Sequence, residues 1–238
     1  MSIARAKVSG LRQMMLLVGK DIRIEARSRQ TIGLVVVLGL LIVVVLGLGL
    51  GLSTSAAGEG TGTQGFGATA VLWVAYLFAG VLCFEKTMAV ERNDGALAGL
   101  MMAPVDRGLI YLAKLISNLI LMLAVAAVVT PAGILFFNFD LSAAPVAFAV
   151  IMALSIIGFA AVGTLFSAMV SSTRLQGGLL AMMVFPISLP LVIASTQLLL
   201  HAFRDGQAPE SSGIGVLVAF DVIFLTASWL LFEWVLEP

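Results

Sequence analysis

The chain has 238 residues, of which 61% are hydrophobic and 11% charged, whereas a soluble globular domain carries about 25% charged residues. A soluble fold of this size would leave large apolar patches in water, so lipid is the expected solvent. Thirteen basic and thirteen acidic residues cancel, and the single Cys83 and single His201 exclude an intramolecular disulfide and a metal site built from several thiolates or imidazoles.

An amphipathic helix is expected over residues 11–29, before the first long apolar run. The apolar residues fall on about a third of its circumference; they are Leu11, Met14, Met15, Val18, Ile22 and Ala26. The opposing sector carries Arg12, Lys20, Arg23 and Arg27. This pattern is typical of a helix that lies in the membrane interface. We expect an elbow that leads into the first span and abuts neighbouring subunits; alternatively, the basic residues only set the topology.

Six uncharged or nearly uncharged apolar runs follow, each long enough to cross the hydrocarbon, which takes roughly 20 helical residues. The runs are 31–52, 66–84, 108–139, 144–170, 175–200 and 213–234, with Pro131 expected to interrupt the third near its end. A barrel would need alternating strands, and no such pattern is visible. The sequence therefore predicts an all-α integral membrane protein with six transmembrane helices in one domain, 1–238.

The basic residues are segregated between alternate connections. Twelve fall on the side of the amino terminus: Arg5, Lys7, Arg12, Lys20, Arg23, Arg27, Arg29, Lys86, Arg92, Arg107, Lys114 and Arg174. The other side has only Arg204. The positive-inside rule then places both termini in the cytoplasm. A cleaved signal peptide ending near residues 53–57 is the alternative for the first run, but the run is long and follows thirty residues.

The connection over residues 85–107 is the longest charged stretch between spans. Within it, Leu97, Leu100 and Met101 recur at helical spacing, Asn93-Asp94-Gly95 is a turn signal, and Pro104 is expected to stop the helix. A short helix with apolar side chains and charged flanks would fit a groove in a soluble partner. The alternative is a solvated loop whose charges fix the topology.

The motif ERNDGALAGLMMAP, with Lys114 downstream, resembles the signature of the haem exporter protein B (CcmB) family, a permease-type subunit of cytochrome c maturation. The run VFPISLPL at 184–191 and Arg174 before Gly177-Gly178 extend the resemblance. It implies an ABC-2-type exporter permease fold and a coupling segment seated on an ATPase of the ATP-binding-cassette (ABC) kind. The contact residues by analogy are Glu91, Asp94, Gly95, Leu97, Leu100 and Pro104.

The resemblance also implies further partners and a location. These are a haem-handling membrane subunit, a small membrane subunit, a second copy of the chain, and the bacterial inner membrane. The sequence has no G-x-x-x-x-G-K-[ST] loop, so ATP would be hydrolysed by the partner and not by this chain. Haem is the expected cargo of the complex, through export or through release of a haem-loaded chaperone. The alternatives are a permease for a lipid or drug, and a non-transporting scaffold.

Three intramembrane or interfacial features carry open interpretations. Pro186 and Pro190 each remove a backbone donor in the fifth run, which indicates a hinge, an element that lines an interior path, or a static kink. Asp221 is an acid well inside the sixth run, where ionisable groups face protein and mark either a functional site or a helix–helix hydrogen bond. His201, at the end of the fifth run, is either a haem ligand or a residue of the interface.

Overall fold

The computed structural model describes residues 10–28, 30–50, 61–93, 107–137, 144–171, 178–205 and 211–235. These residues form seven helices and no strand. The helices are α1 (Gly10–Ser28), α2 (Gln30–Gly49), α3 (Thr61–Asn93), α5 (Arg107–Phe137), α6 (Pro145–Ser171), α7 (Leu179–Asp205) and α8 (Ser211–Val235). All but α1 are long and apolar enough to cross a membrane. The prediction of an all-α protein with six transmembrane helices is confirmed.

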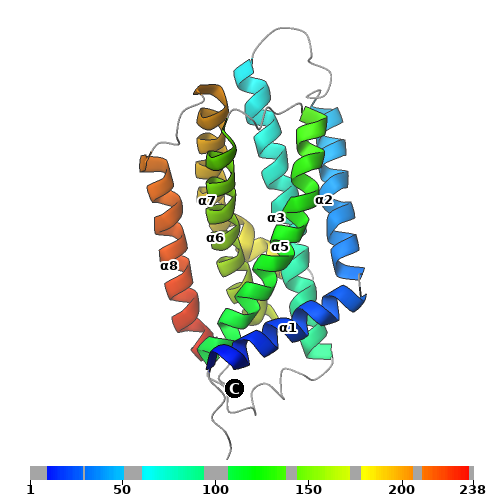
Figure 1. Ribbon diagram of the computed structural model, residues 1–238, viewed down its shortest axis with the longest axis vertical. Coiled ribbons are helices and arrows are strands. Elements are labelled where there is room, and N and C mark those ends of the chain that lie inside the picture. Colours follow the sequence, from blue (N-terminus) through cyan, green and yellow to red (C-terminus); the bar gives the residue numbers. More distant parts are fainter. Residues whose placement is uncertain are drawn as a thin grey trace, which may run out of the picture.

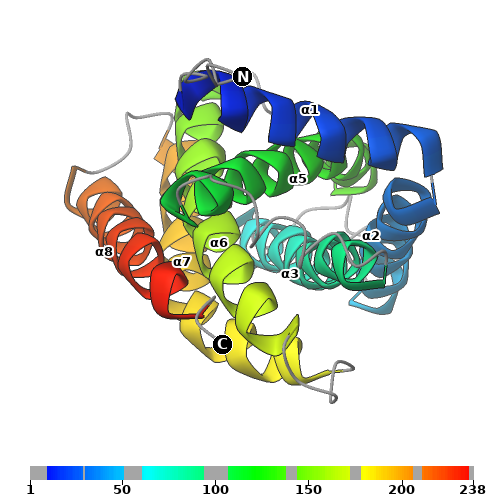
Figure 2. The same ribbon diagram turned by 90° about the horizontal axis from the view of Figure 1, so that it is seen from below.

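The six long helices stand side by side, with α3 at the centre and α2 and α8 at opposite edges (Figures 1 and 2). Helices α2, α5, α6 and α7 all pack on α3. Of the membrane-spanning part of α3, 72% is buried, against 17% of that of α8. Among the described helices α3 is the most enclosed, followed by α6 at 61%. On the edge helices an apolar surface is stable, because hydrocarbon solvates their outer faces.

Helix α1 lies across one end of the bundle, nearly perpendicular to the spans, and follows the outer side of α5 (Figures 1 and 2). Only one residue separates it from α2, which then turns into the bundle. The first turns of α5 and the last turns of α3 and α8 lie at the same end (Figure 1). We call this end the α1 end. The fold thus has a separate amino-terminal helix, α1, that leads by a short turn into α2, as the amphipathic pattern of residues 11–29 predicts. Its position in the membrane interface stays a prediction.

Two glycines let α3 and α6 approach closely through an exchange of aromatic rings. The ring of Phe159 lies against Gly80 of α3, and the ring of Phe84 lies against Gly163 of α6, so a Cβ atom at either glycine would collide with a ring. The two rings also meet each other, with centroids 5.3 Å apart. Between membrane helices, where no hydrophobic driving force acts, such close packing is the main source of association.

The helices differ from the expected runs at Pro131 and at several helix ends. The second expected run ends at residue 84, but α3 continues to Asn93 and so includes the start of the expected connection. Pro131 does not interrupt α5, which runs through it to Phe137. A proline inside a membrane helix is tolerated where local adjustment or neighbouring groups satisfy the freed carbonyl. Helix α7 begins at Leu179 and extends to Asp205, beyond the expected limit at residue 200.

Candidate functional site

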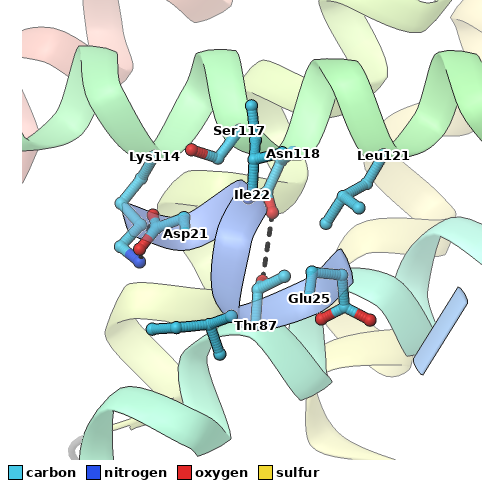
Figure 3. A pocket seen from close by; sticks show the side chains of 9 residues that line it. Asp21, Ile22, Glu25, Thr87, Lys114, Ser117, Asn118 and Leu121 are labelled. Atoms are coloured by element: carbon cyan, nitrogen blue, oxygen red, sulfur yellow. Dashed lines mark hydrogen bonds and ion pairs between the residues drawn. The ribbon is translucent and has the colours of Figure 1, made fainter. Parts of the chain in front are cut away.

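A cluster of buried and partly buried polar side chains lies where α1, α3, α5 and α6 meet, near the α1 end. Its members are Asp21 and Glu25 of α1, Thr87 of α3, Lys114, Ser117 and Asn118 of α5, and Thr164 of α6. We call this set the polar cluster. Six of its members line one cavity, in which the side chains of α1 face those of α3 and α5 (Figure 3).

Lys114 and Asp21 form the charged part of the polar cluster. The ammonium Nζ of Lys114 donates to Oδ2 of Asp21 at 2.8 Å, and Lys114 is only 5% exposed. Lys20, which is more exposed, also approaches the carboxylate of Asp21, at 3.2 Å. A buried ammonium group is stable only when it is paired, so this contact fixes α1 against the first turns of α5.

Glu25 joins α1 to α2. The carboxylate Oε1 of Glu25 accepts a hydrogen bond from the backbone N–H of Ile32 at 3.1 Å, and the residue is 6% exposed. Ile32 lies in the first turn of α2, where backbone donors have no partner within the helix. The helix dipole also favours a negative charge at this position. Glu25 therefore acts as a cap supplied by the preceding helix and holds the elbow in place.

Asn118 ties three long helices together through its amide group. Its Oδ1 accepts a hydrogen bond from Thr87 of α3 at 3.0 Å, and its Nδ2 donates to Thr164 of α6 at 2.9 Å. Asn118 and Thr164 are almost completely buried. Inside the bundle such a bridge selects one register of the three helices, because any shift would leave amide or hydroxyl groups unsatisfied.

The cavity beside these bonds has a volume of about 30 Å³. A water molecule needs roughly 10–15 Å³ by this measure and two to four polar partners. The carboxylates of Asp21 and Glu25, the ammonium group of Lys114 and the amide of Asn118 supply such partners. The polar cluster therefore holds the helices together through ion pairs and hydrogen bonds, and its cavity has room for a water molecule that would hydrate the charged groups.

The sequence predicted that Lys114 helps to orient the chain in the membrane, but it did not predict the partners of this residue. A usable signal was present, since Lys114 is the seventh residue of a run that is otherwise uncharged, and an ammonium group at that depth requires an acid. The partner could not be chosen from the sequence. Asp21 is 93 positions away, and only the orientation of α1 on α5 brings the two together.

Most of the expected ATPase contact lies outside the described residues. Glu91 belongs to the last turn of α3, at the α1 end. Asp94, Gly95, Leu97, Leu100 and Pro104, and the short helix expected around them, fall in the segment 94–106 that the described ranges omit. The flanking helices bring both ends of this segment to the α1 end (Figure 1).

Helix α7 runs without a break through Pro186 and Pro190, whose side chains are exposed on the outside of the described bundle. His201 is likewise exposed, near the end of α7 away from α1. The two prolines therefore do not line an interior path within the described part of the chain. Their role as a hinge stays a prediction.

Asp221 occupies the middle of α8 and points into the junction with α6 and α7. It is 5% exposed, and its Oδ1 has no hydrogen-bond partner among the described residues. Gly158 of α6 makes room for this carboxyl group, because a Cβ there would collide with Asp221 and with Leu191 of α7. The expected helix–helix hydrogen bond is therefore not seen at Oδ1 within the described ranges.

A family model described as CcmB protein matches residues 12–232, which is nearly the whole chain. The chain belongs to the CcmB family. The resemblance noted in the sequence is thereby confirmed, and no match was found among the curated proteins.

Membership in the CcmB family implies a membrane component of a haem exporter system of the ABC kind. Such a component is a permease subunit and not itself an enzyme. The six spans make it a multi-pass membrane protein. The family is part of a multi-subunit ABC haem exporter, so the chain belongs to a membrane complex.

Proposed function

We propose that this chain couples ATP hydrolysis by a partner ATPase to haem export, or to release of a haem-loaded chaperone, in cytochrome c maturation. The observation that carries the proposal is the CcmB family match over residues 12–232. In this proposal the α1 end faces the cytoplasm of a bacterium, both termini lie there, and the ATPase docks on the segment between α3 and α5. A haem-handling membrane subunit, a small membrane subunit and a second copy of the chain complete the complex.

The arrangement of the helices supports coupling at this end. Segment 94–106 connects the central helix α3 to α5, and α5 begins at Arg107 beside α1. Leu109 in the first turn of α5 lies against Gly10 of α1, and Lys114 one turn later is paired with Asp21. A displacement of the docked segment would therefore act on α3, α5 and α1 together, because buried polar bonds join these three helices.

The contact itself is assigned by family analogy to Glu91, Asp94, Gly95, Leu97, Leu100 and Pro104. Leu97 and Leu100 would enter an apolar groove of the ATPase, with the charged residues at its rim. A basic end suits the cytoplasmic side, and α1 and the first turns of α5 carry six basic residues at the α1 end, namely Arg12, Lys20, Arg23, Arg27, Arg107 and Lys114.

The test is a paired replacement, Leu97→Asp with Leu100→Asp, in the tagged full-length chain. We expect the chain to insert normally but to lose the ATPase in pull-down, with loss of c-type cytochromes in the same cells. The matched control is Ala56→Asp with Ala57→Asp, which adds the same charge to the connection at the other end. Unchanged recovery of the ATPase would show that the contact lies elsewhere.

Copurification of partners, together with deletion of the gene, separates the alternatives. A scaffold would copurify with haem-handling subunits but with no ATPase. A lipid or drug permease would keep its ATPase, and deletion of the gene would leave c-type cytochromes at their normal level.

A further inference from the structure

The outward face of α1 carries three arginines. Arg12, Arg23 and Arg27 are all exposed, and at 100° per residue they fall within roughly 60° of one another on the helix surface. Along the axis they extend over about 22 Å. None of them forms an ion pair with another described residue. This row of guanidinium groups is distinct from the polar cluster, which lies on the other side of the same helix.

The acids of α1 do not neutralise this face. Asp21 turns inward to Lys114, and Glu25 turns inward to the N–H of Ile32. The sequence alone suggested a helix of mixed charge, with two acids among four basic residues in positions 12–27. Packing on α5 separates the signs, so that negative charge is buried and positive charge is left at the surface.

No described part of the protein covers this face. A Cβ added to Gly19, which lies in the same sector, would meet nothing within 4 Å. Leu16 is 63% exposed among the arginines, and in the adjoining sector Leu11 and Met15 are exposed to 63% and 61%. Large apolar side chains beside arginines, on a helix that crosses the ends of the spans, match the boundary between acyl chains and headgroups.

We propose that Arg12, Arg23 and Arg27 form a binding site for the phosphate groups of anionic phospholipids in the leaflet at the α1 end. Guanidinium groups bind phosphate oxygens through paired, charge-assisted hydrogen bonds. Leu11 and Met15 enter the acyl region beside them and hold the helix at headgroup depth. The Lys114–Asp21 pair and the Glu25 cap set the rotation of α1 and so aim the arginines at the lipid. The inference does not depend on the function proposed above.

The test uses a fluorophore placed on the face itself. In Gly19→Cys the new thiol is exposed, whereas the native Cys83 is buried and unreactive, so labelling is confined to position 19. The labelled full-length chain is reconstituted in phosphatidylcholine vesicles that contain either brominated phosphatidylglycerol or brominated phosphatidylcholine. Quenching by the two brominated lipids gives the local preference for the anionic one.

We expect a preference for phosphatidylglycerol that falls about fivefold for each arginine replaced by glutamine, since the attraction of one basic residue to an anionic surface corresponds to about that factor. Added salt should reduce it as well. The control is Lys86→Gln, which removes one exposed charge from α3 near the same end and should leave quenching at position 19 unchanged.

Equal quenching by both lipids in the otherwise unaltered chain would overturn the proposal. So would a preference that survives Arg12→Gln, Arg23→Gln and Arg27→Gln together. If those replacements spare the lipid preference and instead remove a copurifying soluble protein, the face binds an acidic protein and the lipid assignment is wrong.

Discussion

The ammonium group of Lys114 lies 2.8 Å from the carboxylate of Asp21 and joins helices that are far apart in the chain. Lys114 is 5% exposed, so the pair is held out of water at the edge of the apolar bundle. Removing one partner of such a pair leaves the other charge buried and uncompensated, which is destabilising. Replacing both partners by apolar residues is often neutral for stability.

Replacing one partner should destabilise the protein strongly. We expect Asp21→Asn to lower the free energy of unfolding by about 3 kcal/mol, since it leaves the buried ammonium group of Lys114 without its carboxylate. Lys114→Met should cost less, because Lys20 still approaches the carboxylate of Asp21 at 3.2 Å. Thermal unfolding of the purified chain in detergent measures this. Lys86→Met on α3 removes an exposed ammonium group and should cost less than about 0.5 kcal/mol. Equal losses in the two positions would contradict the assignment.

Replacing both partners by apolar residues should restore most of the stability. In Asp21→Leu with Lys114→Met no charge remains to be desolvated, and such replacements of buried pairs are often neutral or stabilising. We expect the double variant to unfold within about 1 kcal/mol of the original chain, a strong departure from additivity of the single changes. Additive losses would mean that the two residues act independently.

A side chain at Gly163 should disrupt the ring exchange between α3 and α6. Gly163→Val places methyl groups where the ring of Phe84 lies, and we expect a loss of about 2 kcal/mol from the displaced packing. Gly33→Val on α2 is the control, because a Cβ there meets nothing within 4 Å. If thermal unfolding of the two variants is the same, the close approach is not needed for stability.

The hinge interpretation of α7 leads to a separate prediction. Pro186→Ala with Pro190→Ala returns two backbone donors to the helix and should stiffen it. If α7 bends at these prolines during ATP-driven work, cells with this variant should accumulate fewer c-type cytochromes while the complex still copurifies. Normal cytochrome levels together with a higher unfolding temperature would identify a static kink instead.

The sequence alone was sufficient for the class of the fold and for the family. Uncharged runs of about twenty residues can only be helices in lipid, because every backbone amide must find its partner within its own segment. The amphipathic pattern of residues 11–29 likewise predicted α1, since the placement of apolar and basic residues around a helix depends on local spacing alone.

The exact course of the helices was less accessible. Helix α3 continues past the apolar limit to Asn93, because a helix at a membrane boundary can extend into the polar region. Helix α5 continues through Pro131, because local adjustment or neighbouring groups can satisfy the freed carbonyl. The residues expected to contact the ATPase were inferred by analogy, and five of the six lie outside the described ranges. Their assignment stays a prediction.

The amino-acid sequence by itself determined that lipid surrounds the protein, how many spans it has and to which family it belongs. These properties follow from composition, from the lengths of the apolar runs and from short motifs. Only the tertiary structure decided which way α1 is rotated, because that depends on Lys114 and Ile32 presenting partners for Asp21 and Glu25. The sequence shows that a charge such as that of Lys114, inside an apolar run, needs a partner. Which residue becomes the partner depends on which distant helix surfaces pack together, here α1 and α5.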